Sequence, residues 1–133
     1  MAKVFLSYSR EDAAAAKQLA ECIERAGHQV WWDRQIEGGT RFSAEIDREL
    51  KNADAVVVIW TKSSIESPWV QDEAAEGRDS GRLVPITLGT DKPPLGFRQF
   101  QTINFGSWDG QGDPPALDAL VRAIAQKGGD PQT

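Results

Sequence analysis

Trp69 and Glu73 are the residues of this sequence whose types and spacing most suggest chemistry. They lie four positions apart in a stretch that predicts the start of a helix, because Ser67 can cap a helix and Pro68 suits its first position. Side chains four residues apart share one helical face, so an aromatic ring stands beside a carboxylate there. We interpret the pair as an active site. The plain alternative for Glu73 is a solvated glutamate, as most helix glutamates are.

The composition limits the classes of protein to which the chain can belong. Its 133 residues, of which 40% are hydrophobic and 26% charged, predict one soluble globular domain. The net charge of −5 argues against a nucleic-acid partner, which would need a basic face, but not against a small anion held by local donors. Cys22 and His28 are the only residues of their types, which excludes a disulfide framework and a Cys/His zinc site.

Hydropathy and the tail bear on location and domain organisation. No stretch has the length or apolarity of a membrane span, and the N-terminus lacks the apolar core of a signal peptide. We therefore expect a cytoplasmic protein with no membrane partner. Residues 128–133 predict a linker-like tail after a domain that covers residues 1–127, and we expect that the chain was cut from a longer protein there.

Helical and strand patterns alternate along the chain. The run at residues 55–60 is apolar at every position, which is typical of a parallel strand covered on both faces. Ser9 and Asp12 predict a capping box before the first helix, and Pro85 predicts a strand that is irregular or lies near a sheet edge. The alternation predicts a flavodoxin-like doubly wound α/β fold, with a five-stranded parallel sheet in the order 2-1-3-4-5 and helices on both faces. The strands are expected at residues 3–7, 29–32, 55–60, 83–88 and 102–105.

The predicted topology also locates a ligand site. In a sheet of this order, ligands bind beyond the carboxyl ends of the strands, at the switch point between the first and third strands. Residues 7–10 follow the first strand and residues 61–73 follow the third, while the loop at residues 33–40 leaves the same edge and could cover the crevice. Topology alone therefore places the aromatic–carboxylate pair at the predicted pocket.

Several known chemistries do not fit this edge. The chain lacks a Gly-x-Gly-x-x-Gly motif after the first strand and a Walker A motif, which argues against a tightly held hydride cofactor and a phosphate loop. A response regulator would place acidic residues after the first strand and an Asp at the end of the third, where this chain has Trp60 and Thr61. A Ser-His-Asp triad could use only His28, which begins the second strand at the wrong edge.

Four groups of residues, in order along residues 3 to about 125, resemble the sequence boxes of TIR (Toll/interleukin-1 receptor) domains of bacterial style. Residues 5–9 with Asp12 resemble the first box, and residues 53–58 resemble the start of strand C. Strand B, the BB loop and helix B of the family are matched by Trp31, Trp32 and Asp33, followed by Gly38, Gly39 and Phe42. Helix C is matched by Ser64, Ser67, Trp69, Val70 and Glu73.

The resemblance implies a reaction. Enzymatic TIR domains cleave the nicotinamide–ribose bond of NAD+ and release nicotinamide with ADP-ribose or a cyclised form, and the family's helix C glutamate, here Glu73, is catalytic. One carboxylate suffices because cationic nicotinamide leaves as a neutral molecule, while an anion stabilises the oxocarbenium-like ribose. Trp69 would stack on a ring of the substrate, and Arg10 with backbone donors would meet the diphosphate. NAD+ is then the substrate, with no resident cofactor and no metal.

The remaining candidate residues for substrate binding each have a plainer alternative. Arg10 could be an ordinary surface arginine and Tyr8 could pack beneath a loop, while Trp69 could be a core residue. Asp33 could form a turn, and the glycine pair could serve turn flexibility alone. We expect Trp31 and Trp32 to pack on opposite faces of their strand. The full set of candidates is Trp69, Ser7, Tyr8, Ser9, Arg10, Asp33, Gly38, Gly39 and Phe42.

The resemblance also implies partners. Other TIR domains would bind through the BB loop, giving an active homo-oligomer or filament in a signalling or defence pathway. The alternative is a non-catalytic TIR module that acts as a scaffold or recruits another TIR domain. A third class, a host-directed effector that mimics receptor adaptors, stays open at this point.

Overall fold

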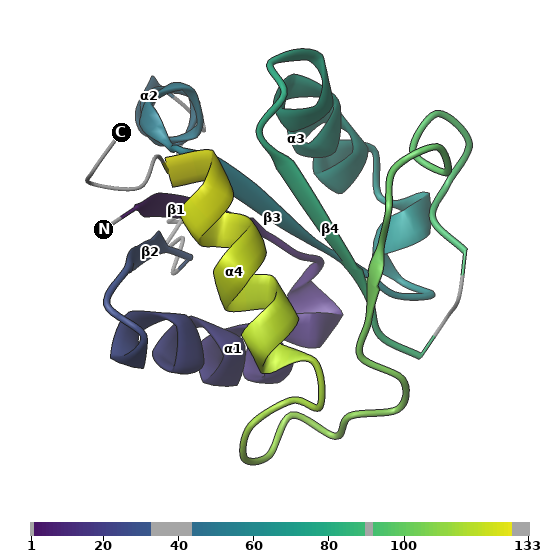
Figure 1. Ribbon diagram of the computed structural model, residues 1–133. Helices are drawn as coiled ribbons and strands as arrows, with labels where there is room; N and C mark the ends of the chain where they lie inside the picture. Colours follow the sequence, from purple (N-terminus) through teal and green to yellow (C-terminus); the bar gives the residue numbers. More distant parts are fainter. Residues whose placement is uncertain (1, 33–43, 90–91, 129–133) are drawn as a thin grey trace.

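Five short apolar runs form one parallel sheet, with neighbouring strands in the order β2-β1-β3-β4-β5 (Figure 1). The computed structural model describes residues 2–32, 44–89 and 92–128. The flavodoxin-like α/β fold and the strand order that the sequence predicts are confirmed. The strands are β1 (Lys3–Ser7), β2 (Gln29–Trp31), β3 (Ala55–Trp60), β4 (Leu83–Thr87) and β5 (Ile103–Asn104).

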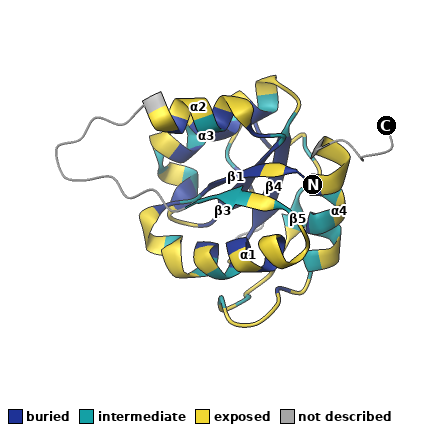
Figure 2. Ribbon diagram, turned by 90° about the vertical axis from the view of Figure 1, so that its left-hand side faces the viewer, coloured by how far each residue is buried: buried dark blue, intermediate teal, exposed yellow. Residues whose placement is uncertain are grey.

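The helices cover the sheet on both faces, as predicted. Helices α1 (Ala13–Arg25) and α4 (Leu117–Gly128) pack on one face, and α2 (Ala44–Asn52) and α3 (Pro68–Asp79) pack on the other (Figure 1). Two short 3₁₀ turns, η1 (Arg10–Asp12) and η2 (Ser64–Glu66), follow β1 and β3. The helices bury their apolar stripes against the strands and expose their polar faces, as Figure 2 shows.

Alternation along β1 decides which side chains face which layer. Val4 and Leu6 enter the core under α1 and α4, whereas Phe5 points to the α2–α3 face. A strand has a period of two, so Ser7 shares the face of Phe5 and lies under α3. The last position of β1 is thus a buried hydroxyl on the helix α3 side, in register with Val58 of β3.

Helix α3 carries the aromatic–carboxylate pair. Its start is as expected, because the Ser67 hydroxyl accepts a hydrogen bond from a first-turn backbone N–H at 3.3 Å and Pro68 lies in that turn. One turn beyond Glu73, a Cβ added to Gly77 would lie 2.9 Å from the Cβ of Val56. Residues 73 and 77 share one helical face, so this glycine lets α3 approach the sheet and brings Glu73 toward β1.

Pro85 illustrates how a proline fits inside a sheet. The backbone N–H of Leu88 donates to Trp60 of β3 at 2.9 Å, and alternation turns the nitrogen of Pro85 to the opposite side, toward β5. Strand β5 pairs with β4 only from Ile86 onward, so the missing donor falls before that ladder begins. The predicted position near a sheet edge is confirmed, since β4 lies next to the edge strand.

The predicted capping box at Ser9 and Asp12 is wrong. The chain first makes the 3₁₀ turn η1, and Ser9 forms no side-chain cap. Instead, its hydroxyl donates to the Asp12 carboxylate at 2.7 Å. The Asp12 carboxylate also accepts a hydrogen bond from Thr61, which follows β3. Ser9 and Asp12 therefore connect two loops and do not cap a helix.

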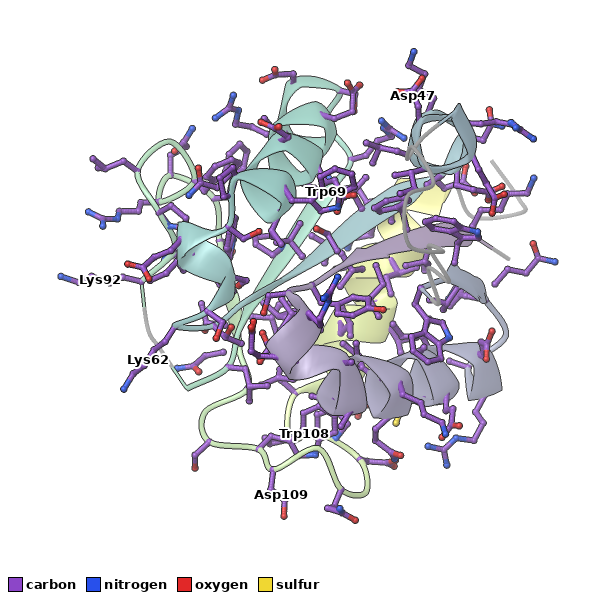
Figure 3. All side chains as sticks on the ribbon, turned by 180° about the vertical axis from the view of Figure 1, so that it is seen from behind. Asp47, Lys62, Trp69, Lys92, Trp108 and Asp109 are labelled. Atoms are coloured by element: carbon purple, nitrogen blue, oxygen red, sulfur yellow. The ribbon has the colours of Figure 1, made fainter. Side chains whose placement is uncertain are left out.

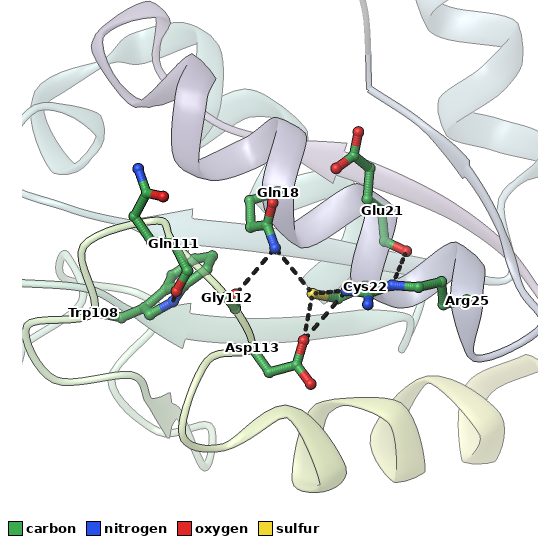
Figure 4. A network of polar contacts seen from close by, with 8 residues as sticks. All are labelled: Gln18, Glu21, Cys22, Arg25, Trp108, Gln111, Gly112 and Asp113. Carbon is green, nitrogen blue, oxygen red and sulfur yellow. Dashed lines mark hydrogen bonds and ion pairs between the residues drawn. The ribbon is translucent and has the colours of Figure 1, made fainter.

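A group of hydrogen-bonded residues, called here the α1 cluster, connects the loop before α4 to helix α1 (Figure 4). Its members are Gln18, Cys22, Arg25, Gly112 and Asp113. The Arg25 guanidinium donates to the Asp113 carboxylate at 3.2 Å and approaches the Cys22 sulfur at 3.1 Å. Gln18 donates to the Gly112 carbonyl at 3.1 Å. Burial is the main cause that raises the pKa of the Cys22 thiol.

Some predictions concern residues that lie outside the described ranges. They include the loop at residues 33–40, the end of the tail at residues 129–133, and the candidates Asp33, Gly38, Gly39 and Phe42. Among the residues that are described, no helix combines the length and apolarity that crossing a bilayer requires.

Candidate active site

A hollow of about 540 Å³ opens at the carboxyl edge of the sheet, between the loops that follow β1 and β3. This is the switch point of the sheet, where β1 is flanked by β2 and β3. Its volume falls in the range of small-molecule sites, roughly 300–1,000 Å³. The residues that line it include Tyr8, Ser9 and Arg10 from the β1 side and Ser63, Ser67 and Trp69 from the β3 side.

A second hollow of about 230 Å³ lies between α2 and α3. Ile46 and Leu50 of α2 form its apolar side, and Glu73 contributes to its α3 side. Trp69 lines both hollows and is 39% exposed. Trp69 is therefore not a core residue; it is the second residue of α3 and is labelled in Figure 3.

Glu73 is a buried acid with a partner on the sheet. Its residue is only 5% exposed, and its carboxylate oxygen Oε1 accepts a hydrogen bond from the Ser7 hydroxyl at 2.7 Å. That distance fits a hydroxyl donating to a charged acceptor, which is stronger than a neutral hydrogen bond. A carboxylate taken out of water without such a donor would be costly. The structure therefore keeps a carboxylate at the hollow and fastens it to the end of a central strand.

Asp12 joins the two loops that frame the larger hollow. Its Oδ2 accepts from the Ser9 hydroxyl at 2.7 Å and from the Thr61 hydroxyl at 2.6 Å. Ser9 follows β1 and Thr61 follows β3, so the carboxylate of Asp12 joins its own loop to a residue 49 positions further along the sequence. The bridge fixes the spacing of the loops at the carboxyl edge.

Ser64 completes the β3 side of the frame. Its hydroxyl donates to the Ile59 carbonyl at 2.6 Å and accepts from the Thr61 backbone N–H at 2.7 Å. These bonds shape the turn before η2, as serine hydroxyls commonly do near their own backbone. Together, Ser7, Ser9, Asp12, Thr61, Ser64 and Glu73 are called here the carboxyl-edge cluster.

Tyr8 and Arg10 occupy the β1 side of the larger hollow. The Tyr8 hydroxyl donates to the Trp32 carbonyl at 2.7 Å, and the two rings lie 6.5 Å apart. Tyr8 thus both lines the hollow and packs toward β2, which joins the two alternatives that the sequence left open. Arg10 is exposed at the rim, where its guanidinium could meet an anionic group of a ligand.

The structure brings six of the candidate residues to one edge of the sheet: Ser7, Tyr8, Ser9, Arg10, Trp69 and Glu73. The neighbouring acids Asp72 and Glu76 are exposed. Trp31 packs in the α2–α3 core and Trp32 in the α1–α4 core, which confirms that they point to opposite faces.

Two features of the site did not come from the sequence. The roles of Asp12 and Thr61 depend on loop positions that only the register of β1 with β3 brings together. Ser63, at the rim of the larger hollow, has no pattern that singles it out. Within the described ranges, no group of three or more His, Cys, Asp or Glu residues could hold a metal ion.

Comparison with known proteins assigns the family. A family model described as TIR domain matches residues 4–121, which is most of the chain. The fold, the strand order and the position of the site at the switch point agree with this match. The chain belongs to the TIR-domain family.

Solved structures show the same fold. A metazoan TIR-STING receptor from C. gigas in complex with 2′,3′-cGAMP aligns with a TM-score of 0.74 at 22% identity, over 91% of this chain and 38% of that one. The receptor without that complex gives 0.70 at 21% identity, over 92% and 40%. The TIR domains of the activated Roq1 resistosome give 0.55 at 21%, over 68% and 60%. This chain thus spans about two fifths of the receptor chains. A comparison with curated proteins gave no match.

Proposed function

We propose that this TIR domain is an NAD+ hydrolase that cleaves the nicotinamide–ribose bond. The observation that carries the proposal is the buried carboxylate of Glu73, which accepts a hydrogen bond from Ser7 and lines the smaller hollow. Trp69 lines that hollow and also the larger one at the switch point. Perturbed environments for ionisable groups in a crevice are typical of catalytic sites. Membership of the TIR family, some of whose members are enzymes of this kind, supports the same reaction.

The reaction needs one well-placed anion. The bond between the nicotinamide nitrogen and C1′ of the ribose breaks, and its electron pair neutralises the cationic ring. Positive charge then develops on the ribose, and the carboxylate of Glu73 stabilises it electrostatically. Water adds to C1′ and loses a proton to give ADP-ribose, or an adenine nitrogen adds to give the cyclic form.

Other residues of the larger hollow would bind the rest of the substrate. Trp69 offers an exposed indole face on which a planar base can stack, a contact of about 1–3 kcal/mol. Arg10 stands at the rim as a donor for the diphosphate. The hydroxyls of Ser63 and Ser67 line the same hollow and could bond ribose or phosphate oxygens.

Assembly is the second part of the proposal. We infer that TIR–TIR contacts through the BB loop complete or activate the site, so nicotinamide release per molecule should rise with protein concentration. Asp33, Gly38, Gly39 and Phe42 keep their predicted part in that loop or in substrate binding. One structural relative, the activated Roq1 resistosome, is an assembly that contains TIR domains.

Incubation with NAD+ and, separately, with NADH tests the reaction. Concentrated protein should release nicotinamide and ADP-ribose, or its cyclic form, from NAD+. NADH should stay intact, because its reduced ring would have to leave as an anion. Loss of NADH at a comparable rate would contradict the charge-neutralising mechanism. Absence of nicotinamide at every protein concentration, including conditions that drive assembly, would contradict the enzyme proposal itself.

The alternative function is a non-catalytic TIR scaffold. It predicts that self-association depends on the BB loop and that no NAD+ is consumed. Substitution of Gly38 and Gly39 should then abolish self-association, measured by light scattering, while Glu73→Ala leaves it intact. If the domain is an enzyme, both variants should lose nicotinamide release. The glycine variant would lose it because it cannot assemble, and Glu73→Ala because it lacks the catalytic carboxylate.

A further inference from the structure

Ser7 differs from the other candidate residues because it has no access to a ligand. Its residue is fully buried at 0% exposure, whereas Tyr8 and Arg10 line the larger hollow. Its hydroxyl donates to Oε1 of Glu73 at 2.7 Å. Glu73 lines the smaller hollow, whereas Ser7 lines neither hollow. A substrate in the smaller hollow would therefore meet Glu73 and not Ser7.

We propose that Ser7 is a positioning residue, which acts on the reaction only through the carboxylate of Glu73. This inference rests on the proposed NAD+ cleavage and refines the expectation that Ser7 binds substrate directly. The hydroxyl holds Oε1 of that carboxylate at a defined place. Misplacement of a catalytic group by about 1 Å can cost as much as about 100-fold in rate.

The place of Ser7 in the sheet makes it a rigid support. It is the last residue of β1, which lies between β2 and β3, and it is in register with Val58. Sites built on central strands hold geometry better than sites built on loops. Helix α3 is in turn seated by the close approach of Gly77 to Val56, so both partners of the hydrogen bond are held by the core.

The chemical type of the partner also matters. A lysine or arginine in this place would hold the carboxylate but would also cancel its charge. A serine hydroxyl is a neutral donor, so it orients the anion without placing a positive charge beside it. A hydrogen bond that served only the fold would not need a neutral donor.

The test compares kcat and KM for NAD+ in the wild-type protein, Ser7→Ala and Ser7→Thr, below the thermal midpoint of each. We expect Ser7→Ala to lower kcat about 10- to 100-fold with KM within about threefold of the wild type. Ser7→Thr keeps the hydroxyl and should recover most of that loss. Thr87→Val is the control, because it removes a buried hydroxyl from the end of β4, where Thr87 bonds Asn104 outside the site. Its kcat should equal that of the wild type.

Two results would overturn the proposal. One is a Ser7→Ala kcat within about threefold of the wild type; the other is a loss that lies wholly in KM, which would mean direct contact with substrate. A wild-type protein that never cleaves NAD+ would instead defeat the proposed function. In that case a crystal structure of Ser7→Ala still decides the positioning: an unmoved Glu73 carboxylate overturns it, and a displaced one supports it.

Discussion

The carboxyl-edge cluster and the α1 cluster both join segments that are far apart in sequence, yet they treat their charges differently. In the α1 cluster, the side chains of Arg25 and Asp113 are 64% and 63% exposed, and opposite charges meet in solvent (Figure 4). At the carboxyl edge, Glu73 is buried and its partner on β1 is a neutral hydroxyl. The α1 cluster attaches a loop to a helix. The carboxyl-edge cluster instead holds the carboxylate of Glu73 in a buried position, which is unfavourable for a charged group.

The difference in burial suggests different roles for the two clusters. An exposed ion pair contributes little to stability, about 0–1 kcal/mol, and can be lost at small cost. A buried carboxylate is costly for the fold and is retained where its charge is used. The contrast predicts that changes at the carboxyl edge alter the reaction, while changes in the α1 cluster alter at most the free energy of unfolding.

Two tryptophans give the largest contrast. Trp69→Ala should raise KM for NAD+ about 10- to 100-fold, because it removes a stacking surface worth about 1–3 kcal/mol, with little effect on unfolding. Trp108 lies on the other side of the sheet, against Phe105 at 5.9 Å (Figure 3). Trp108→Ala should lower the free energy of unfolding by about 1–3 kcal/mol and leave KM unchanged. Steady-state kinetics and urea unfolding of both variants measure these effects. A Trp69→Ala variant with the KM of the wild type would contradict the proposal that Trp69 stacks on the substrate.

Two aspartates sharpen the comparison at the level of stability. Asp12→Ala should lower the free energy of unfolding by about 1–3 kcal/mol, because the Ser9 and Thr61 hydroxyls both lose their acceptor. Asp113→Ala removes an exposed ion pair and should cost at most about 1 kcal/mol. Urea unfolding measures both, and equal losses would mean that Asp12 does not bridge the loops.

Gly77 tests how the core supports the site. Gly77→Ala gains about 1 kcal/mol of helix propensity, but its Cβ would press on the Cβ of Val56 at 2.9 Å, and overpacking costs about 1–3 kcal/mol. We expect a net loss of about 1 kcal/mol by thermal unfolding, and a fall in kcat because Glu73 moves with α3. Gain of stability with full activity would show that α3 tolerates the shift.

His28 provides the smallest effect and lies in neither cluster. Burial first, and the N-terminal charge second, lower its pKa below the usual value of about 6.5. Its neutral Nδ1 accepts from the Ala2 backbone N–H at 3.0 Å. A lowered native pKa means that this stabilisation is present above about pH 6.5 and is lost as the pH falls through the native value. Denaturant midpoints between pH 5 and 7.5 should therefore fall less steeply for His28→Asn; equal slopes would refute the assignment.

The sequence was sufficient for the frame of the molecule but not for the contacts at its edge. The all-apolar run of β3 and the alternation of elements fix a parallel sheet, and the sheet order then fixes where Trp69 and Glu73 lie. The bond of Ser7 to Glu73 and the Asp12 bridge required the strand register and the close seating of α3, which depend on three-dimensional packing. The Ser9–Asp12 pattern misled because the same side chains suit a helix cap and a bridge between loops.

The central claim is that the buried carboxylate, and not merely an acidic helix, performs the reaction. The most direct test is the rate of nicotinamide release at saturating NAD+ by Glu73→Gln, with Asp72→Asn as the control. Asp72 lies next to Glu73 on α3 and lines the same hollow, but it is exposed. The account predicts a loss of at least about 100-fold for Glu73→Gln and a rate within about threefold of the wild type for Asp72→Asn. Equal rates for the two variants would contradict it.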